Sequence, residues 1–279
     1  MTTRAILITG CSSGIGLDAA TALKARGYRV FATARKPEDL ARLEGLGLEA
    51  LMLDYRDSAS VQACAAIVAE RCGGTLFALF NNGAYGQPGA VEDLSRAVLE
   101  EQFAANVFGW HELTRACLPL LRAHAAAHGT ARIVQCSSVL GLLALKWRGA
   151  YNASKFALEG LTDTLRLELL GTGIAVVTLN PGPIATRFVD NAVAAFSRNI
   201  DMSHSLHVAE FEAQRQKLAR GGSTRFKLPP AAVTAKLITA LEHPRPRPHF
   251  FVTLPTHVAA LARRFLPARW LAAFAARNS

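Results

Sequence analysis

The stretch Ala5-Ile-Leu-Ile-Thr9-Gly10-Cys-Ser-Ser-Gly14-Ile-Gly16 places a short apolar run before a turn with three glycines, and a helical pattern follows over residues 14–26. Glycines permit a tight turn and the close approach of another backbone. The start of the following helix presents free N–H groups and a positive dipole end to an anion. In this context we interpret the loop as a pyrophosphate-binding turn rather than an ordinary one. Its candidate contacts are Gly10, Ser12, Ser13, Gly14, Ile15 and Gly16.

The same alternation of strand and helix continues to about residue 180. Expected strands lie at 5–9, 28–33, 49–54, 75–81, 131–137 and 174–180, and expected helices at 14–26, 37–46, 58–72, 96–127 and 151–171. The strands are continuously apolar rather than alternating, which indicates a sheet covered on both faces. The sequence therefore predicts an α/β fold with a Rossmann-type doubly wound parallel sheet and right-handed crossovers, in a single domain.

After Pro181 the pattern changes. Residues 185–229 are mixed in composition and predict a long irregular insertion with one or two short helices, and such a segment is typically a lid or binding loop. A helix near 230–243 and a strand near 249–254 resume the earlier pattern. We expect a domain over residues 1–255, with 185–229 as its substrate-binding loop, and a helical C-terminal segment over 256–279.

Composition excludes several classes of protein. The 279 residues are 51% hydrophobic and 19% charged, which is too apolar for a disordered chain. The five cysteines form no Cys-x-x-Cys pair, and no histidines stand at zinc spacing, so no metal site is expected. No apolar run reaches the roughly 18 residues that span a membrane, and only four residues precede the first strand. We expect a soluble cytoplasmic protein.

The net charge of +10 is concentrated at one end of the chain. Residues 217–279 contain 11 of the 31 lysines and arginines but only one acid, Glu242, whereas residues 1–216 are neutral overall. A basic tail fits an anionic ligand, an anionic membrane surface or a solvated face. No nucleic-acid partner is expected, because the tail contains no recognised reader motif.

The end of the second expected strand bears on cofactor choice. An Asp or Glu there would accept a hydrogen bond from the 2′-OH of an adenosine ribose and favour NAD(H). This sequence has Arg35 and Lys36 instead. A guanidinium suits a 2′-phosphate, and Ser12 adds a hydroxyl. The sequence therefore predicts NADP(H) in preference to NAD(H), against the alternative of two solvated bases at the start of a helix.

A second group of residues suggests proton transfer. Tyr151 and Lys155 stand four apart at a helix start, which brings the phenol and the ammonium onto one face. A nearby cation lowers a phenol's pKa toward neutrality. Ser138 follows the fifth expected strand, at the sheet edge where the glycine loop and Asn81 also lie. We expect these residues to face one crevice.

With these motifs in order, residues 4–190 resemble the short-chain dehydrogenase/reductase family. The resemblance implies catalytic roles for Asn106, Ser138, Tyr151 and Lys155. It implies cofactor contacts from the glycine loop and from Asp54, Asn81, Gly83, Tyr151, Lys155, Pro181, Gly182, Ile184 and Thr186. One departure is visible, because Gly83 and Ala84 are swapped relative to the family's usual order, and we expect a slightly altered turn.

Within the family, the chain looks most like the 17β-hydroxysteroid and retinol dehydrogenase-like branch, and within that branch like bacterial NADP-dependent aldehyde reductases. The stretches that carry this likeness are 182–188 and 264–267, together with Ser-Ser-Val-Leu-Gly-Leu at 137–142. This implies reversible hydride transfer between NADP(H) and a hydrophobic aldehyde or ketone, with Tyr151 as general acid/base. The alternative is a catalytically silent NADP(H)-binding sensor or scaffold.

The substrate loop and the tail leave more than one interpretation. Phe188, Phe196, Leu206, Phe211 and Phe226 either line a hydrophobic site or only pack the loop. The segment 256–279 combines apolar and basic residues around Pro267, which we expect to separate two short helices. The segment fits peripheral membrane contact, a cap on the pocket or packing on a partner subunit. The resemblance also implies a homodimer or homotetramer through the long helices at 96–127 and 151–171.

Overall fold

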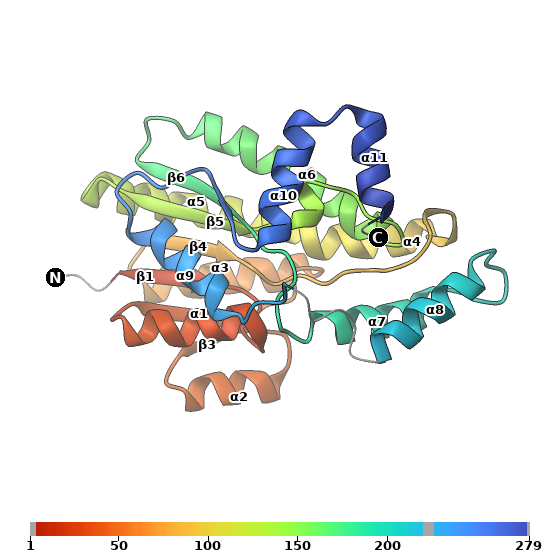
Figure 1. The fold of residues 1–279 in the computed structure, drawn as a ribbon. Coiled ribbons are helices and arrows are strands. Elements are labelled where there is room, and N and C mark those ends of the chain that lie inside the picture. Colours follow the sequence, from red (N-terminus) through yellow and green to blue (C-terminus); the bar gives the residue numbers. More distant parts are fainter. Residues whose placement is uncertain (1–3, 220–225, 278–279) are drawn as a thin grey trace.

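A computed structural model describes residues 4–219 and 226–277, and its centre is a seven-stranded parallel sheet (Figure 1). The strand order is β3-β2-β1-β4-β5-β6-β7, and every neighbouring pair is parallel. The strands are β1 (Ala5–Ile8), β2 (Arg29–Ala34), β3 (Glu49–Met52), β4 (Ala78–Asn81), β5 (Ala131–Cys136), β6 (Ile174–Asn180) and β7 (His249–Phe251). This confirms the predicted doubly wound fold.

Helices cover both faces of this sheet. The helices of the described residues are α1 (Gly14–Ala25), α2 (Pro37–Gly45), α3 (Ser58–Arg71), α4 (Arg96–Phe103), α5 (Gly109–His128), α6 (Gly149–Glu168), α7 (Phe188–Asn199), α8 (Val208–Ala219), α9 (Ala231–Glu242), α10 (Leu254–Phe265) and α11 (Ala268–Arg277). Helices α1 and α9 pack together on one face, and α3 and α5 pack together on the other. Ile6, Leu7 and Ile8 of β1 are fully buried, which explains why this strand is apolar throughout.

One connection breaks the right-handed rule. Helix α9 lies beside α1, although the step from β6 to β7 runs across the sheet in the opposite direction to the step from β1 to β2. A right-handed β1-α1-β2 unit therefore requires β6-α9-β7 to be left-handed, an exception to the expected crossover hand. Because of this change of face, the chain between β6 and α9 crosses the carboxyl edge of the sheet.

The segment that crosses this edge is more ordered than its composition predicts. It contains α7 and α8, each of 12 residues. Phe196 and Phe211 pack edge to face at 4.9 Å, and Phe211 packs on Trp147 at 5.4 Å. These rings belong to a second small core with Leu94 and Ile200. Packing within the loop and against Trp147 and Leu94 therefore accounts for Phe196 and Phe211.

The helix predicted over 96–127 is also divided. It consists of α4, a π-helical turn at Ala104–Phe108, and α5. Such turns insert one residue into a helix and often occur at functional sites. At the other end of the chain, α10 ends at Phe265 and α11 begins at Ala268, so Pro267 separates two helices as predicted. No helix in the described ranges is both long and apolar enough to cross a membrane.

A buried hydrogen-bond network joins β1 to β4 and to the loop after β3. The Tyr55 hydroxyl lies 2.8 Å from Thr9 Oγ1 and 2.7 Å from Asn81 Oδ1. Thr9 Oγ1 also accepts hydrogen bonds from the backbone N–H groups of Asn82 and Gly83. Burial raises the pKa of Tyr55 well above its ordinary value, so the hydroxyl stays protonated and donates.

Replacing Tyr55 by Phe should destabilise the fold, because it leaves buried polar atoms of Thr9 and Asn81 without this partner. We expect a loss of about 1–3 kcal/mol in the free energy of unfolding, measured by urea denaturation. Tyr28→Phe is the matched control, since its hydroxyl makes a long, part-buried hydrogen bond of 3.5 Å to the Glu242 carboxylate and lies outside the network of Thr9 and Asn81. Equal stability of the Tyr55→Phe and Tyr28→Phe variants would contradict the importance of the network.

Candidate active site

The predicted site residues meet at the carboxyl edge of the sheet. The glycine loop follows β1, Arg35 follows β2, Asp54 follows β3, and Ser138 follows β5. Tyr151 lies in the first turn of α6, whose first residue is Gly149. Parallel strands end at a common edge, so segments distant in sequence are brought into one crevice.

The glycine loop is held against the turn after β4. A Cβ on Gly10 would lie 2.5 Å from the Gly83 Cα, and Gly10 has a positive φ of 69°. A Cβ on Gly16 would clash with the Gly10 carbonyl. Gly83 itself approaches the Gly10 nitrogen closely, since a Cβ there would lie 3.2 Å away. The swapped order Gly83-Ala84 therefore puts the residue without a side chain at the point of contact.

The start of α1 is prepared for an anion. Ser13 precedes the helix, but its side chain does not cap it, and no acidic residue lies in the first turn. By contrast, the Asp57 side chain caps α3. The first N–H groups of α1 are therefore left without a side-chain acceptor, as a phosphate-binding helix start requires. Ile15 packs on the main core and anchors this turn.

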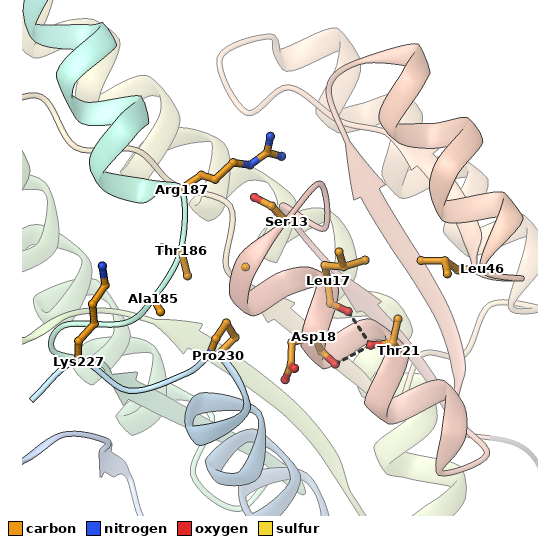
Figure 2. A pocket seen from close by; sticks show the side chains of 11 residues that line it. Ser13, Leu17, Asp18, Thr21, Leu46, Ala185, Thr186, Arg187, Lys227 and Pro230 are labelled. Atoms are coloured by element: carbon orange, nitrogen blue, oxygen red, sulfur yellow. Dashed lines mark hydrogen bonds between the residues drawn. The ribbon is translucent and has the colours of Figure 1, made fainter. Parts of the chain in front are cut away.

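A groove of ≈ 740 Å³ runs along this helix start. Figure 2 shows Ser13 with Leu17 and Thr21 of α1 on one side, and Ala185, Thr186 and Arg187 opposite them. A Cβ on Gly14 would lie 2.8 Å from Thr186 Cγ2, so the segment after β6 packs on the glycine loop. The structure thus brings two predicted cofactor-contacting segments together.

The segment Pro181–Thr186 is supported from behind. The carbonyl of Pro181 accepts a hydrogen bond of 2.8 Å from the Val139 N–H, just after Ser138. Gly182 packs on Thr253, so closely that a Cβ would clash with its hydroxyl. Ile184 is partly buried in the main core and pairs with Leu228 in an isolated bridge. These contacts fix the segment at the edge of the crevice.

Basic side chains gather where an adenosine ribose would lie. Arg35 is exposed after β2, and Lys36 lies 3.7 Å from Glu38. Arg42 of α2 donates a hydrogen bond to the Ser12 carbonyl, and Arg187 donates to the same oxygen at 3.3 Å. Sequence reasoning found Arg35 and Lys36 but missed Arg42, because seven residues separate Arg42 from the strand end.

Asp54 is part of a chain of charges that reaches the insertion. Its carboxylate pairs with Arg56 at 2.7 Å, Arg56 pairs with Glu101 of α4, and Glu101 pairs with Arg198 of α7, the last two at 3.1 Å. Burial raises the pKa of Asp54. The hydrogen bonds and the charge of Arg56 together lower it by more than burial raises it, so the pKa lies below its ordinary value. Asp54 therefore stays ionised, and the chain of pairs ties α7 to this edge.

Asn81 is placed differently from the other predicted contacts. It is fully buried, with its side chain bonded to the Tyr55 hydroxyl and, at 3.0 Å, to Thr114. The side chain of Asn81 is thus committed to the network beneath the crevice and points into the core. Trp110 also lies beneath the crevice, where it donates a 2.7 Å hydrogen bond to the Gly83 carbonyl.

The three residues Ser138, Tyr151 and Lys155 lie together, and each is nearly buried. Burial raises the pKa of Tyr151 above its ordinary value, while the hydrogen bond with the Ser138 hydroxyl and the charge of Arg148 lower it. The phenol therefore remains protonated at neutral pH. We expected Lys155 to lower this pKa, but the lowering contributions come from Ser138 and Arg148.

Lys155 is held by the backbone of β5 and by aromatic rings. Its Nζ donates a 2.8 Å hydrogen bond to the Cys136 carbonyl. The same atom lies 4.5 Å from the Trp110 ring centroid and 5.7 Å from that of Tyr151. Burial lowers the pKa of Lys155 to about 8, against smaller opposing effects of Cys136 and Glu159. The predicted proximity of the ammonium and the phenol is present.

Asn106 lies within the π-helical turn. Its Nδ2 donates to the Tyr85 carbonyl at 2.9 Å and to Ser154 Oγ at 3.2 Å, and its Oδ1 accepts from the Tyr85 N–H at 3.3 Å. The π turn thus directs a fully buried amide toward α6, which contains Tyr151 and Lys155.

Phe188, the first residue of α7, covers Tyr151. The two ring centroids are 5.3 Å apart, and a Cβ on Gly86 would lie 2.9 Å from Phe188 Cζ. By contrast, Leu206 and Phe226 are exposed. Of the five apolar residues predicted to cover the site, Phe188 is thus the one that contacts a predicted catalytic side chain.

The C-terminal helix α10 supports the Ser138 loop. Arg263 donates hydrogen bonds of 3.2 Å to the carbonyls of Gly141 and Leu142, which follow Ser138. From the other side, Asn180 donates to the Glu159 carboxylate at 2.6 Å and to the Ser138 carbonyl at 3.4 Å. Sequence reasoning missed these supports, because the tertiary fold alone brings them to the serine.

Comparisons with known proteins agree with this geometry. A model of the short chain dehydrogenase family matches residues 4–195. The chain belongs to the short-chain dehydrogenase family. The protein is therefore an oxidoreductase with an NAD(P)-binding Rossmann fold. Among the described residues, no group of three His, Cys, Asp or Glu side chains could hold a metal ion.

Relatives of this dehydrogenase cover most of its length. It is 40% identical over 266 residues to the uncharacterized oxidoreductase YbbO of Escherichia coli strain K12, covering 95% of this chain and 91% of that protein. It is 32% identical to human 17-beta-hydroxysteroid dehydrogenase type 1, covering 94% and 78%. A Burkholderia phymatum short chain dehydrogenase/reductase in complex with NAD superposes with a TM-score of 0.77 at 27% identity, covering 94% and 92%.

The buried Lys155 makes stability of the dehydrogenase depend on pH. Its pKa is about 8 when folded, against 10.5 ordinarily, so between these pH values the unfolded chain holds more protons. The free energy of unfolding of the wild type should therefore rise relative to that of Lys155→Met from about pH 8 to pH 10. Urea denaturation across this range measures the difference.

The matched control is Lys36→Met, which removes an exposed lysine. Its free energy of unfolding should run parallel to that of the wild type over the same range. A constant difference between wild type and Lys155→Met would show that Lys155 does not titrate there.

Proposed function

We propose that the protein transfers hydride reversibly between NADP(H) and a hydrophobic aldehyde or ketone. The observation that carries this proposal is the hydrogen-bonded pair of Ser138 and Tyr151, with Lys155 beside it, at the same sheet edge as the glycine loop. A proton donor, a hydroxyl that holds an oxygen and a buried cation meet where the loop would bind a dinucleotide. Carbonyl reduction needs that combination.

The chain offers a cradle for the dinucleotide. Gly10, Gly14 and Gly16 let the loop pack against Gly83, Thr186 and its own backbone, where a Cβ would clash, and the uncapped start of α1 faces the same edge. Arg35, Lys36 and Arg42 are the cations suited to a 2′-phosphate, and no acid occupies the two positions directly after β2. When bound, the nicotinamide supplies or accepts the hydride.

The residues of the chain handle the substrate oxygen and its proton. In reduction, the Ser138 hydroxyl donates a hydrogen bond to the carbonyl oxygen and orients it. Tyr151 donates its proton to that oxygen as the alcohol forms, acting as general acid. The charge of Arg148, which lowers the pKa of Tyr151, stabilises the phenolate left behind, and the Lys155 ammonium lies beside the ring. Asn106 fixes the Tyr85 segment against α6, so the crevice keeps its shape.

The surroundings of Tyr151 favour an apolar substrate. Phe188 covers the phenol, with the two ring centroids 5.3 Å apart. The related human enzyme is named for a hydroxysteroid, an apolar alcohol. We infer that α7 moves or its first turn repacks to admit the substrate, with the rest of 185–229 as the substrate-binding loop.

Replacing Tyr151 by Phe should abolish turnover while leaving cofactor binding nearly unchanged, because the phenol oxygen is lost but the ring remains. NADPH oxidation followed at 340 nm with aliphatic aldehydes, retinal and steroid ketones measures turnover. Removal of the general acid should cost at least about 100-fold in rate. Retained activity in the variant would contradict the mechanism, and NADPH binding without turnover on any carbonyl in the wild type would favour the sensor alternative.

Replacing Arg35 by Ala should weaken NADPH but not NADH, because only NADPH carries the 2′-phosphate. Loss of one charge-assisted contact of about 1.5–3 kcal/mol corresponds to roughly 10- to 100-fold in Kd. Titration of the cofactors by fluorescence measures both constants without turnover. Arg96→Ala, an exposed arginine on α4, is the control. An equal effect of Arg35→Ala on NADH and NADPH would count against the assignment.

A further inference from the structure

Helix α10 carries an apolar stripe that no described element covers. Leu254, Val258, Leu261 and Phe265 are 58%, 40%, 58% and 70% exposed, and their spacing puts them on one side of the helix. The opposite side, with Thr256, Ala259 and Ala262, is buried against the body of the protein. The inner face of α10 is therefore already packed against the protein, and the apolar stripe faces outward.

Helix α11 extends this surface. None of its residues is buried, and Trp270 is 58% exposed. Figure 1 shows α10 and α11 as a helical hairpin at the top of the molecule. A ten-residue helix is only marginally stable without packing. A surface from outside the chain would supply the burial that α11 lacks.

The charged side chains of the hairpin itself are all of one sign. Residues 254–277 contain four arginines and no acid. Arg263 is turned inward to Gly141 and Leu142. Arg264 and Arg269 lie near the exposed rings of Phe265 and Trp270, at 5.8 and 5.9 Å. None of the described ion pairs involves Arg264, Arg269 or Arg277.

We propose that the hairpin α10–α11 docks on the surface of an anionic lipid bilayer. Exposed leucine, phenylalanine and tryptophan side chains enter the interface between headgroups and acyl chains, and the arginines contact the anionic headgroups. A second copy of the chain fits this face poorly, because its arginines would oppose these without acids to pair with them. This inference does not depend on the reaction proposed above.

Docking would also bring lipid close to the catalytic edge. Helix α10 contacts the 3-10 turn Val139–Gly141, which immediately follows Ser138. The hairpin that holds the membrane therefore also supports the serine loop. An apolar substrate leaving the bilayer would have a short path to the crevice.

The test is co-sedimentation of the full chain with vesicles of phosphatidylcholine alone or with 40% phosphatidylglycerol added. We expect binding to the anionic vesicles that falls with added salt. Each arginine near such a surface contributes about 1 kcal/mol, so Arg264→Glu/Arg269→Glu should weaken partitioning by at least about 30-fold. Phe265→Ser/Trp270→Ser should weaken it by a similar factor, because it removes two apolar anchors.

Matched controls carry the same changes elsewhere on the surface. Arg96→Glu/Arg122→Glu reverses two exposed charges on α4 and α5, and Leu167→Ser/Leu170→Ser removes two exposed leucines, one in the last turn of α6 and one just after it. Both controls should bind like the wild type. Circular dichroism should show that each variant is folded.

Fluorescence provides a second measurement of docking. Trp110 is buried and Trp147 is partly buried in the second small core, whereas Trp270 is exposed, so anionic vesicles should shift the emission of the wild type to the blue but not that of Trp270→Phe. Equal sedimentation of the wild type and both hairpin variants would overturn the proposal. So would binding that ignores lipid charge, or loss of self-association in the hairpin variants without any vesicle binding, which would make this face a contact between copies.

Discussion

The close approach of Gly10 to Gly83 is the contact on which the crevice depends. The two backbones meet where a Cβ on Gly10 would lie 2.5 Å from the Gly83 Cα. Thr9 and Tyr55 fix this contact from below through hydrogen bonds to the β4 turn. Because the loop after β1 is pressed against the turn after β4, the start of α1 faces the same space as Ser138 and Tyr151. The spacing of every other group follows from that closure.

In the rest of the site, burial disfavours the charged forms of the side chains, and nearby polar groups and charges favour them. Lys155 is a fully buried cation, stabilised by the Cys136 carbonyl and the rings of Trp110 and Tyr151. The same burial keeps the Tyr151 phenol protonated. The site therefore holds a proton donor and a cation side by side at a cost in stability, and this arrangement suits proton transfer to an oxygen that develops negative charge.

Much of the fold and of the candidate site could be predicted from the sequence, because the strands and the main motifs are local patterns. The apolar runs of β1 and β4, the glycine turn and the four-residue step from Tyr151 to Lys155 all lie in short windows. Their meeting at one edge follows from the parallel sheet. The predicted cluster of Ser138, Tyr151 and Lys155 is thus present as geometry, and their catalytic roles remain a proposal.

The features that could not be predicted from the sequence depend on contacts between residues distant along the chain. Arg263 reaches the Ser138 loop across 122 positions, and Arg42 reaches Ser12 across 30. The position of α9 beside α1 made one crossover left-handed, which local pattern cannot reveal. Trp147 has a positive φ of 63°, held by its packing on Phe211 rather than by any turn residue. Such features arise from packing and have no signature in a short window of sequence.

The central claim is that hydride passes between the nicotinamide and a carbonyl carbon held by Ser138 and Tyr151. The most direct measurement is mass spectrometry of the alcohol formed from a hydrophobic aldehyde with NADPH dideuterated at C4 of the nicotinamide. The account predicts one deuterium on the carbinol carbon of the wild-type product. Alcohol formed without deuterium at that carbon would contradict it.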